Sequence, residues 1–246
     1  MLRVLLLLAL LVGVAMGAST TSVLFVGNSL TSKNNLPLHL KTLAQAAGRP
    51  MAVFTSLKGS STLCDHVRLY DTLKKIRSRK YSVVVLQDQS SYLARGLWFA
   101  ETSVWPCAKV LAEAARNSSA RVVLYETMAY TTGFGSELSS YELMQQEIVT
   151  QYEALRNYLG CETAHVGTAF ALAKTQLAIG GFTGLYAVGD VKHPSQRGTF
   201  LAASTMYATI YNKSPVGIKL LPWLARRVYK PFALKAQKWA ANATLQ

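Results

Sequence analysis

The sequence predicts an α/β fold, a three-layer α/β/α sandwich built on a flavodoxin-like, parallel, five-stranded sheet. Short apolar runs, rich in β-branched residues, alternate along the chain with longer stretches of helical pattern. These runs are apolar throughout, which is typical of strands covered by helices on both faces. The chain has 246 residues, half of them hydrophobic, and this is enough for one domain with a sizeable core.

The third of the five expected strands is the most apolar. The strands are expected at residues 23–26, 52–55, 83–86, 122–125 and 163–166. The helices are expected at residues 36–47, 67–79, 101–116, 138–158 and 194–211. Gly48 and Gly160 mark helix ends, and Pro106 marks either the start of its helix or a kink. This alternation gives right-handed crossovers between parallel strands.

The first 17 residues have the pattern of a secretory signal peptide. A short basic start is followed by an uncharged, mostly aliphatic run from Val4 to Met16, which ends in small residues suited to cleavage. The alternative is a membrane anchor, but the run is shorter than the roughly 20 apolar residues of a typical span. We therefore expect residues 1–17 to be removed and the protein to be secreted or to enter the lumen of the secretory pathway.

Entry into that pathway has two consequences for the covalent chemistry. Candidate N-glycosylation sites are Asn117, Asn212 and Asn242, of which the second is weakened by Pro215. The three cysteines are Cys64, Cys107 and Cys161. They allow at most one intrachain disulfide, and the sequence does not determine which two pair. Their spacing fits no zinc site, so no metal is expected.

The net charge of +14 is concentrated toward the C-terminus, where residues 213–246 contain seven Lys/Arg and no acidic residue. One interpretation is a surface that contacts anionic glycan or membrane. The other, which we favour, is a solvated extension packed on the domain through its apolar residues. The expected organisation is thus a domain over residues 18–212 and a basic extension over residues 213–246. No nucleic-acid-binding motif is present, and no nucleic acid partner is expected. The sequence does not determine the oligomeric state.

Polar and small residues follow the expected strands, at the edge of the sheet where such folds bind ligands. Ser29 follows the first strand, and Asp190 and His193 lie just before the last helix. A serine nucleophile needs a base, and the base needs an orienting carboxylate. Pro194 favours an extended backbone at His193, which lets Asp190 reach one imidazole nitrogen while the other faces Ser29. The alternative is that Asp190 caps the helix beside a surface histidine.

Several motifs of other enzyme classes are missing from the sequence. There is no Gly-x-Ser-x-Gly, which argues against the nucleophile elbow of α/β-hydrolases. There is no Gly-x-Gly-x-x-Gly and no Walker A loop, so nucleotide binding is not indicated. No cofactor is therefore expected.

Three segments resemble the sequence blocks of SGNH (GDSL-like) hydrolases. Residues 26–31, Val-Gly-Asn-Ser-Leu-Thr, resemble the first block, whose commoner form is Gly-Asp-Ser. Gly59, after the second strand, resembles the glycine of the second block. Residues 190–193, Asp-Val-Lys-His, resemble the final Asp-x-x-His block. The resemblance runs over residues 23–211, nearly all of the expected mature chain.

The third block departs from the usual Gly-x-Asn-Asp. Residues 86–91 read Leu-Gln-Asp-Gln-Ser-Ser, similar to an uncharacterised SGNH branch with Leu-Gln-Glu-Gln-Ser. That branch also has Gly-Ser-x-Leu and a histidine after the second strand, matched here by residues 59–63 and His66. Gln89 falls at the position of the family's oxyanion-hole asparagine, and Gln87 is the competing candidate.

The resemblance implies a serine esterase that removes small acyl groups, such as acetyl, from glycans or related esters. Its implied catalytic residues are Ser29, His193 and Asp190, and its implied oxyanion hole is formed by Ser29, Gly59 and Gln89. Further candidate pocket residues are Asn28, Gln87, His66, Lys58 and Lys192. His66 either lines the pocket or packs, and the two lysines either favour anionic substrates or are solvated.

Two other functions remain open at this point. One is acyl transfer to a sugar hydroxyl at the same site, and the other is a non-catalytic protein that binds glycans or surfaces. Trp98 and Trp105 either stack on sugar or lie in the core, and we expect the core.

Overall fold

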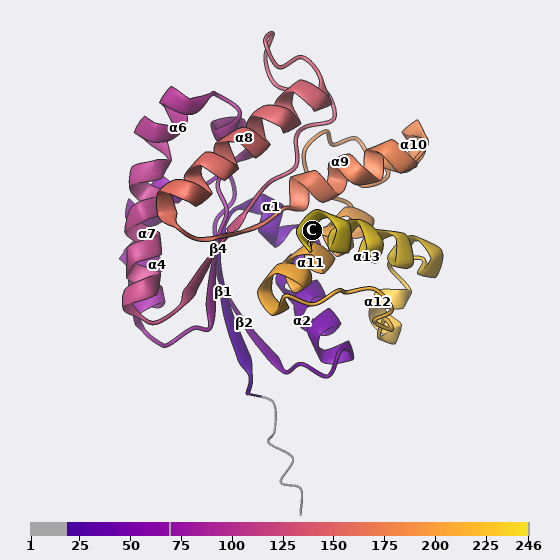
Figure 1. Ribbon diagram of the computed structural model, residues 1–246, viewed down its shortest axis with the longest axis horizontal. Helices are drawn as coiled ribbons and strands as arrows, with labels where there is room; N and C mark the ends of the chain where they lie inside the picture. The colour runs from indigo at the N-terminus through magenta and orange to yellow at the C-terminus, as the bar shows by residue number, and fades with distance from the viewer. Residues whose placement is uncertain (1–18, 69, 246) are drawn as a thin grey trace, which may run out of the picture.

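The protein is described here from a computed structural model that places residues 19–68 and 70–245 (Figure 1). The expected signal peptide, residues 1–17, lies outside the described residues.

A single parallel sheet forms the centre of the fold, as the sequence predicts. Its strands are β1 (Thr21–Gly27), β2 (Met51–Leu57), β3 (Val83–Leu86), β4 (Arg121–Tyr125) and β5 (Glu162–Ala164). Their spatial order is β2-β1-β3-β4-β5, and each neighbouring pair is parallel. In this flavodoxin-like order the chain reverses direction across the sheet between β1 and β3, where such folds bind their ligands.

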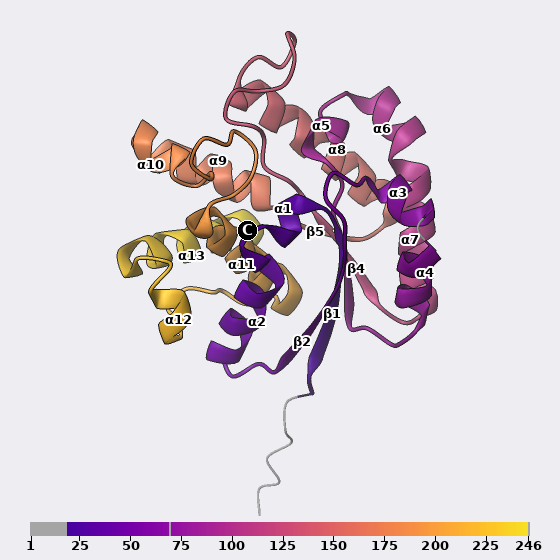
Figure 2. The same cartoon turned by 180° about the vertical axis from the view of Figure 1, so that it is seen from behind.

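Helices cover both faces of the sheet, which confirms the predicted three-layer sandwich. One face carries α2 (Leu36–Ala46) and α11 (Gln196–Tyr211), and the other carries α4 (Tyr70–Arg77), α7 (Trp105–Asn117) and α8 (Tyr141–Leu159) (Figures 1 and 2). Because the sheet is covered on both sides, every side chain of β3 is buried.

The remaining helices lie in the connections between these elements or pack on them. They are α1 (Ser29–Ser32), η1 (Lys33–Asn35), α3 (Leu63–Arg68), α5 (Ser90–Leu93), α6 (Leu97–Ser103), α9 (Val166–Gln176), α10 (Ile179–Thr183), α12 (Pro222–Ala225) and α13 (Lys230–Thr244). Within the described residues no helix is both long and apolar enough to cross a membrane.

Two of the expected helices are each divided into two. The helix expected at residues 101–116 is interrupted at Val104, which ends α6 and precedes α7. Pro106 lies in the first turn of α7, where a missing N–H costs nothing, so it starts a helix rather than kinking one. The helix expected at residues 67–79 is likewise divided between α3 and α4.

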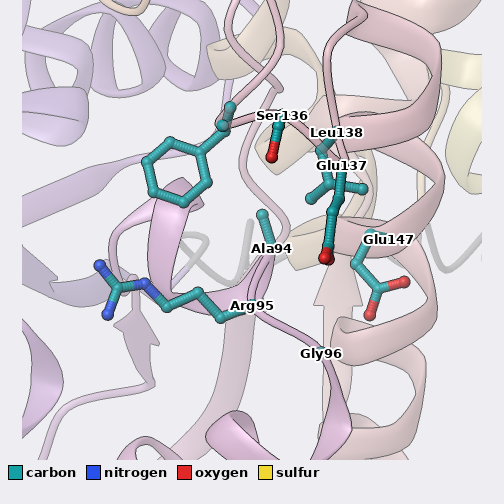
Figure 3. Close-up of a pocket in the computed structure, with 9 residues that line it drawn as sticks. Ala94, Arg95, Gly96, Ser136, Glu137, Leu138 and Glu147 are labelled. Atoms are coloured by element: carbon teal, nitrogen blue, oxygen red, sulfur yellow. The ribbon is translucent and has the colours of Figure 1, made fainter.

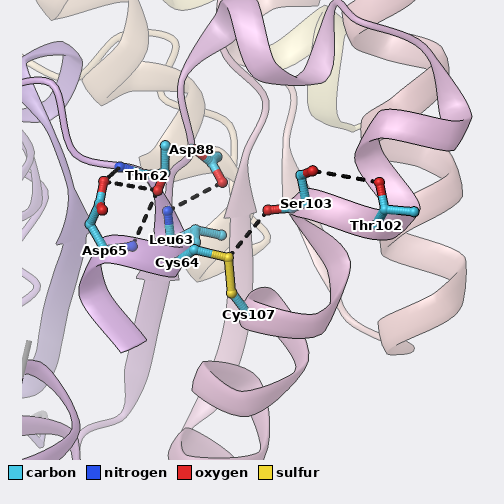
Figure 4. Close-up of a disulfide and its surroundings, with 8 residues drawn as sticks. All are labelled: Thr62, Leu63, Cys64, Asp65, Asp88, Thr102, Ser103 and Cys107. Carbon is cyan, nitrogen blue, oxygen red and sulfur yellow. Dashed lines mark hydrogen bonds between the residues drawn. A yellow bond between two sulfur atoms is a disulfide. The ribbon is translucent and has the colours of Figure 1, made fainter. Parts of the chain in front are cut away.

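Cys64 and Cys107 form a disulfide that joins α3 to α7 (Figure 4). Cys161 is a free, partly buried thiol. The pairing that the sequence left open is therefore decided by which helices the fold brings together. Burial raises the pKa of the Cys161 thiol to about 11, which keeps it protonated at neutral pH.

The basic C-terminal extension packs on the domain through α13, which lies against α11 and α9 (Figures 1 and 2). Trp239 of α13 is 1% exposed, and its indole Nε1 donates a hydrogen bond to Gln176 at 2.8 Å. Lys235 and Lys238 point to solvent from the opposite side of the same helix. The apolar face of this helix thus completes the domain, while its charges remain solvated.

One expectation about the core is wrong. Trp98, on α6, is 76% exposed, because its turn of the helix faces solvent. Trp105 is partly buried and stacks on the ring of Tyr158, with ring centroids 4.7 Å apart.

Candidate active site

The structure brings together three side chains that the sequence predicts as a catalytic triad. Nε2 of His193 lies 2.8 Å from the Ser29 hydroxyl, although the two residues are 164 positions apart in the sequence. Nδ1 of His193 lies 2.6 Å from a carboxylate oxygen of Asp190. A carboxylate only accepts, so Nδ1 carries the proton and Nε2 is left to accept from the serine hydroxyl. This is the arrangement of nucleophile, base and orienting acid that serine hydrolysis requires.

The loop that carries the histidine is fixed from both sides. The His193 carbonyl accepts from the backbone N–H of Ala187 at 2.9 Å. The next carbonyl, that of Pro194, accepts from the Asn34 side-chain amide at 2.8 Å. Helix α11 is capped by Ser195, whose hydroxyl accepts from the N–H of Gly198. Asp190 is therefore not the helix cap, and its carboxylate is available to the imidazole.

Hydrogen bonds keep Asp190 ionised. Partial burial opposes its charge, but the backbone N–H groups of Lys192 and His193 donate to Oδ1 at 2.9 and 3.1 Å, and the imidazole bonds to Oδ2. Together they lower the pKa of Asp190 to about 2. The carboxylate is thus charged at any pH where the imidazole acts as a base.

A buried amide network holds the turn that presents the nucleophile. Ser29 begins the one-turn helix α1, and the side chain of Asn28 caps that turn by accepting from the Leu30 N–H at 3.0 Å. The Asn28 amide group donates to the Ser61 carbonyl at 2.9 Å. Its backbone N–H donates to the side-chain oxygen of Gln87, also at 2.9 Å. Asn28 is 3% exposed, so these bonds are shielded from water.

Gln87 belongs to this support and not to the pocket, contrary to one of the expectations from the sequence. It is fully buried, its oxygen also accepts from the Thr31 hydroxyl at 2.9 Å, and its Nε2 donates to the Asp88 carbonyl at 2.6 Å. A Cβ on Gly27 would lie 2.5 Å from the Gln87 oxygen, so this position requires glycine. Both polar atoms of the Gln87 amide are therefore committed to structural bonds.

A small cavity of about 70 Å³ opens beside the Ser29 hydroxyl. It is lined by Asn28, Ser29, Leu30, Ser60, Gln89, Ser90, Tyr130, Lys192 and His193. Sites for drug-sized ligands usually measure roughly 300–1,000 Å³, so this one holds only a small group.

Comparison with known proteins places this geometry in a known fold. No family model matches the chain, and no curated protein matches it in sequence. Among solved structures, a DUF4886 family protein from Bacteroides uniformis has a TM-score of 0.77 and 20% identity over 92% of this chain and 95% of its own. A candidate SGNH hydrolase from Slackia heliotrinireducens has a TM-score of 0.63 and 25% identity over 78% of this chain and 100% of its own.

The chain has the SGNH/GDSL-like hydrolase fold. An acetylxylan esterase from Geobacillus stearothermophilus shares this fold, with a TM-score of 0.59 and 16% identity over 79% of this chain and 95% of its own. The fold resemblance inferred from the sequence blocks is thereby confirmed.

Residues of the second and third SGNH blocks line the cavity beside Ser29. In the second block, the residue that lines the cavity differs from the expected Gly59. Lys58 to Ser61 form a turn closed by the Ser61 N–H and the Lys58 carbonyl at 3.2 Å. Ser60 occupies the third position of this turn with a φ of 59° and lines the cavity, whereas Gly59 is exposed and does not. Of the two residues at the centre of this turn, Ser60 is therefore the one in the cavity lining.

Gln89 lies where the SGNH third block places its amide, at the wall of the cavity. Its Nε2 donates to the Ser60 carbonyl, which aligns the amide and leaves its second N–H for another acceptor. The Ser29 backbone N–H lies in the first turn of α1, where a helix supplies no acceptor. The donors gathered at the cavity therefore include the Ser29 N–H and the Gln89 amide.

His66 packs below the SGNH site and does not line it. It is 1% exposed, with Nε2 bonded to the Gly27 carbonyl at 2.8 Å and Nδ1 to the Thr72 hydroxyl at 3.1 Å. Burial lowers the pKa of His66, so the ring is neutral and donates from Nε2. Lys58 is exposed and also lies outside the cavity lining, so only Lys192 of the two expected lysines borders the site.

Tyr130 is the main site residue that sequence reasoning missed. It lies five positions after β4, deeper into that loop than Glu126 and Thr127, the residues that directly follow the strand. The side chain of Glu126 is instead buried against the first turn of α9. There it accepts from the N–H and the hydroxyl of Thr168 at 2.6 and 2.8 Å. An aromatic residue in a loop after a strand was the available signal for Tyr130.

Asp88 connects the third block to α3. Its carboxyl accepts from the backbone N–H of Gln89 at 2.7 Å. It also accepts from the backbone N–H of Leu63 at 3.2 Å (Figure 4). Burial raises the pKa of Asp88 to about 7, because the carboxylate loses hydration, and the charge of Asp65 adds to this effect. Among the described residues no group of three or more His, Cys, Asp or Glu side chains is arranged to hold a metal ion.

Proposed function

We propose that the protein is a secreted serine esterase that removes small acyl groups, such as acetyl, from glycans. The observation that carries this proposal is the unbroken chain of hydrogen bonds from Ser29 through His193 to Asp190. The presence of an acetylxylan esterase among proteins of the same fold supports the choice of ester and carrier. The proposed secretion rests on the signal-peptide pattern of residues 1–17.

The geometry supports a two-step mechanism. The Ser29 oxygen attacks the ester carbonyl carbon while His193 Nε2 accepts the hydroxyl proton, and Asp190 stabilises the imidazolium that forms. The tetrahedral intermediate then expels the sugar hydroxyl, which takes the proton from His193. Water, deprotonated by the same imidazole, attacks the acyl-enzyme and releases the acid and free Ser29.

The oxyanion of each tetrahedral intermediate is stabilised by N–H donors at the cavity. The candidates are the Ser29 backbone N–H, the second N–H of the Gln89 amide and a backbone N–H of the turn at Gly59 and Ser60. Donors fixed in place before the reaction stabilise the developing charge more than water does, because they need no reorganisation.

The size of the cavity supports a short acyl chain. Its volume is about 70 Å³, with Leu30 and Tyr130 among the lining residues, which is too small for a long acyl chain. We expect kcat/KM to fall steeply as the acyl chain lengthens from acetyl to octanoyl. Equal activity on both esters would contradict the small-acyl assignment.

A fluorophosphonate probe tests the nucleophile directly. The wild type is expected to label, and Ser29→Ala is expected to lose both labelling and esterase activity by at least about 10³-fold. Ser90→Ala, a serine in the same cavity without a histidine partner, is the matched control and is expected to label. Labelling of Ser29→Ala at the wild-type level would contradict the assignment. A binding protein without catalysis would label in neither form.

Hydrolysis and acyl transfer are separated by following the acyl group. With acetylated oligosaccharide as donor, the esterase releases acetate in amounts equal to the ester consumed. A transferase would instead move acetyl to an added glycan acceptor with little free acetate.

A further inference from the structure

Figure 3 shows a second cavity, of about 430 Å³, which is larger than the cavity at Ser29. It is bounded by the end of α5, the loop at residues 129–140 and one residue of α8. Its lining is Ala94, Arg95, Gly96, Phe134, Gly135, Ser136, Glu137, Leu138 and Glu147. This volume is in the usual range for a small-molecule site, roughly 300–1,000 Å³. No residue of the triad contributes to it.

The two cavities have no lining residue in common, but the same two segments, α5 and the loop after β4, contribute residues to both. Ser90, at the start of α5, lines the catalytic cavity, and Ala94, one helical turn later, lines the second cavity. One turn advances the chain by about 5–6 Å. Tyr130 lines the catalytic cavity and packs edge-on against Phe134 of the second, with ring centroids 6.2 Å apart. The two cavities are therefore close neighbours, at a spacing that suits a ligand with several linked units.

Arg95 presents unused hydrogen-bond donors at this second cavity. Its guanidinium lies over three aromatic rings, at 5.2 Å from Tyr92, 4.8 Å from Phe99 and 5.9 Å from Phe134. In the described part of the chain the guanidinium forms no ion pair with a carboxylate, even though Glu137 and Glu147 line the same cavity. The rings hold the group in place while its N–H donors remain available to ligand oxygens.

Carboxylates supply matching acceptors. Figure 3 shows Glu137 and Glu147 on the same side of the cavity, away from the Arg95 guanidinium. One oxygen of Glu147 accepts from Gln151 at 2.8 Å, which orients the carboxylate and leaves its other oxygen for a ligand. Carboxylates accept from hydroxyls and repel anions, so the two acids select against an acidic ligand. An aromatic wall, carboxylate acceptors and a guanidinium together suit an uncharged molecule with many hydroxyls.

We propose that this second cavity binds an uncharged sugar residue of the acylated glycan, adjacent to the residue whose ester reaches Ser29. The assignment rests on the proposed esterase function for its substrate, but sugar binding here is measurable without catalysis. With a sugar site of this kind, the enzyme would act on neutral oligosaccharides, and Arg95 and Glu147 would determine which sugar is bound.

Calorimetric titration of Ser29→Ala with unacetylated oligosaccharides tests the site apart from the chemistry. The probes are neutral xylo-, cello- and N-acetylchito-oligosaccharides and, for comparison, oligogalacturonate. We expect at least one neutral probe to bind, and to bind about tenfold or more tightly than the uronate. Adding Glu147→Gln or Arg95→Lys is expected to weaken that binding about tenfold, whereas adding Glu113→Gln, an exposed glutamate on α7, leaves it unchanged.

Kinetics on acetylated oligosaccharide give the second readout. In the otherwise wild-type enzyme, Glu147→Gln is expected to raise KM about tenfold while kcat is largely retained, because the substitution lies outside the triad. The proposal is overturned if no neutral probe binds, if the uronate binds more tightly, or if neither variant weakens binding. Failure of the esterase function has a different signature, since neutral probes would bind at the cavity while no ester is hydrolysed.

Discussion

Buried side-chain amides, more than apolar packing, fix the nucleophile at the scale of single residues. The Asn28 side chain uses its oxygen on α1 and its nitrogen on the Ser61 carbonyl, so it bridges the first and second SGNH blocks. Gln87 then ties the same turn to the end of β3. The position of Ser29 thus depends on three sheet-edge loops that are remote from one another in sequence.

Substitution of the two glutamines of the third block is expected to affect different properties, stability for Gln87 and catalysis for Gln89. Gln87→Ala leaves the Asn28 N–H and the Thr31 hydroxyl buried without a partner, at about 1–3 kcal/mol each in unfolding free energy. Gln89→Ala removes the proposed oxyanion donor from the cavity wall and is expected to lower kcat about 10²–10³-fold with little loss of stability. Urea unfolding and steady-state kinetics on both variants check this. A stability loss confined to Gln89→Ala would reverse the assignment.

Asp190 gives the protein a dependence on acid pH whose sign follows from its hydrogen bonds. Its pKa falls from an ordinary value of 3.8 to about 2 in the folded state. The stability that it contributes is therefore present above about pH 4 and is lost as the pH falls from 4 to 2. Asp190→Asn is expected to flatten this part of the profile and to lower kcat about 10⁴-fold, because the imidazole loses its orienting acceptor.

Urea midpoints measured between pH 2 and 6 test the stability part of this prediction. Exposed Glu101→Gln, whose carboxyl is not in the site, is the control. Parallel profiles for the wild type and Asp190→Asn between pH 2 and 4 would contradict the expected linkage.

At the scale of helices and strands, α3 is the element that connects the site to the outer layer. At the N-terminus of α3, the Leu63 N–H donates a hydrogen bond to the Asp88 carboxyl. One residue later, Cys64 forms the disulfide with Cys107 of α7. The loop with Ser60 and the loop with Gln89 are thereby anchored to a helix that packs on the sheet.

Removing this cross-link is expected to destabilise the whole domain. The disulfide closes a loop with a sequence separation of 43, for which the loss is about 2–4 kcal/mol in unfolding free energy. Cys107→Ser is therefore expected to lower the urea midpoint clearly, and Cys161→Ser, at the free thiol, only slightly. Wild-type protein unfolded with and without reductant provides a second comparison. Equal midpoints for the two variants would show that the disulfide adds little.

The whole molecule depends on its C-terminal helix. Helix α13 covers α11 and α9, and its apolar face includes the fully buried Trp239. The basic extension, residues 213–246, thus contributes to the domain core, although its composition alone is typical of a solvated basic tail.

Trp239→Ala is expected to cost about 3–5 kcal/mol of unfolding free energy, because it empties a large buried volume and leaves Gln176 without its donor. Lys238→Ala, the exposed neighbour on the same helix, is expected to change stability by less than about 0.5 kcal/mol. Thermal or urea unfolding measures both. A similar small effect for both would mean that α13 is not part of the cooperative unit.

How far the sequence predicts the molecule depends on the range of the interactions involved. The five strands and most helices follow from local patterns, since apolar runs and helix ends are set by neighbouring residues. The break at Val104, the short helices α1 and α5 and the longer helices α9 and α13 were not predicted, because tertiary packing also determines where helices form and end. Val166, expected in the fifth strand, is instead the first residue of α9. The signal peptide and the glycosylation sites remain predictions; Asn117, Asn212 and Asn242 are all exposed.

The α/β class, the parallel sheet, the SGNH blocks and the candidate triad can be predicted from the sequence, because each depends on residue type and order along the chain. The folded structure is needed to show that Ser60 and Gln89 line the cavity while Gly59 and Gln87 do not, that His66 packs below it, and that Cys64 pairs with Cys107. These choices depend on which way a turn or an amide points once distant segments meet. That direction is set by hydrogen bonds and packing between segments, and these contacts exist only in the folded chain.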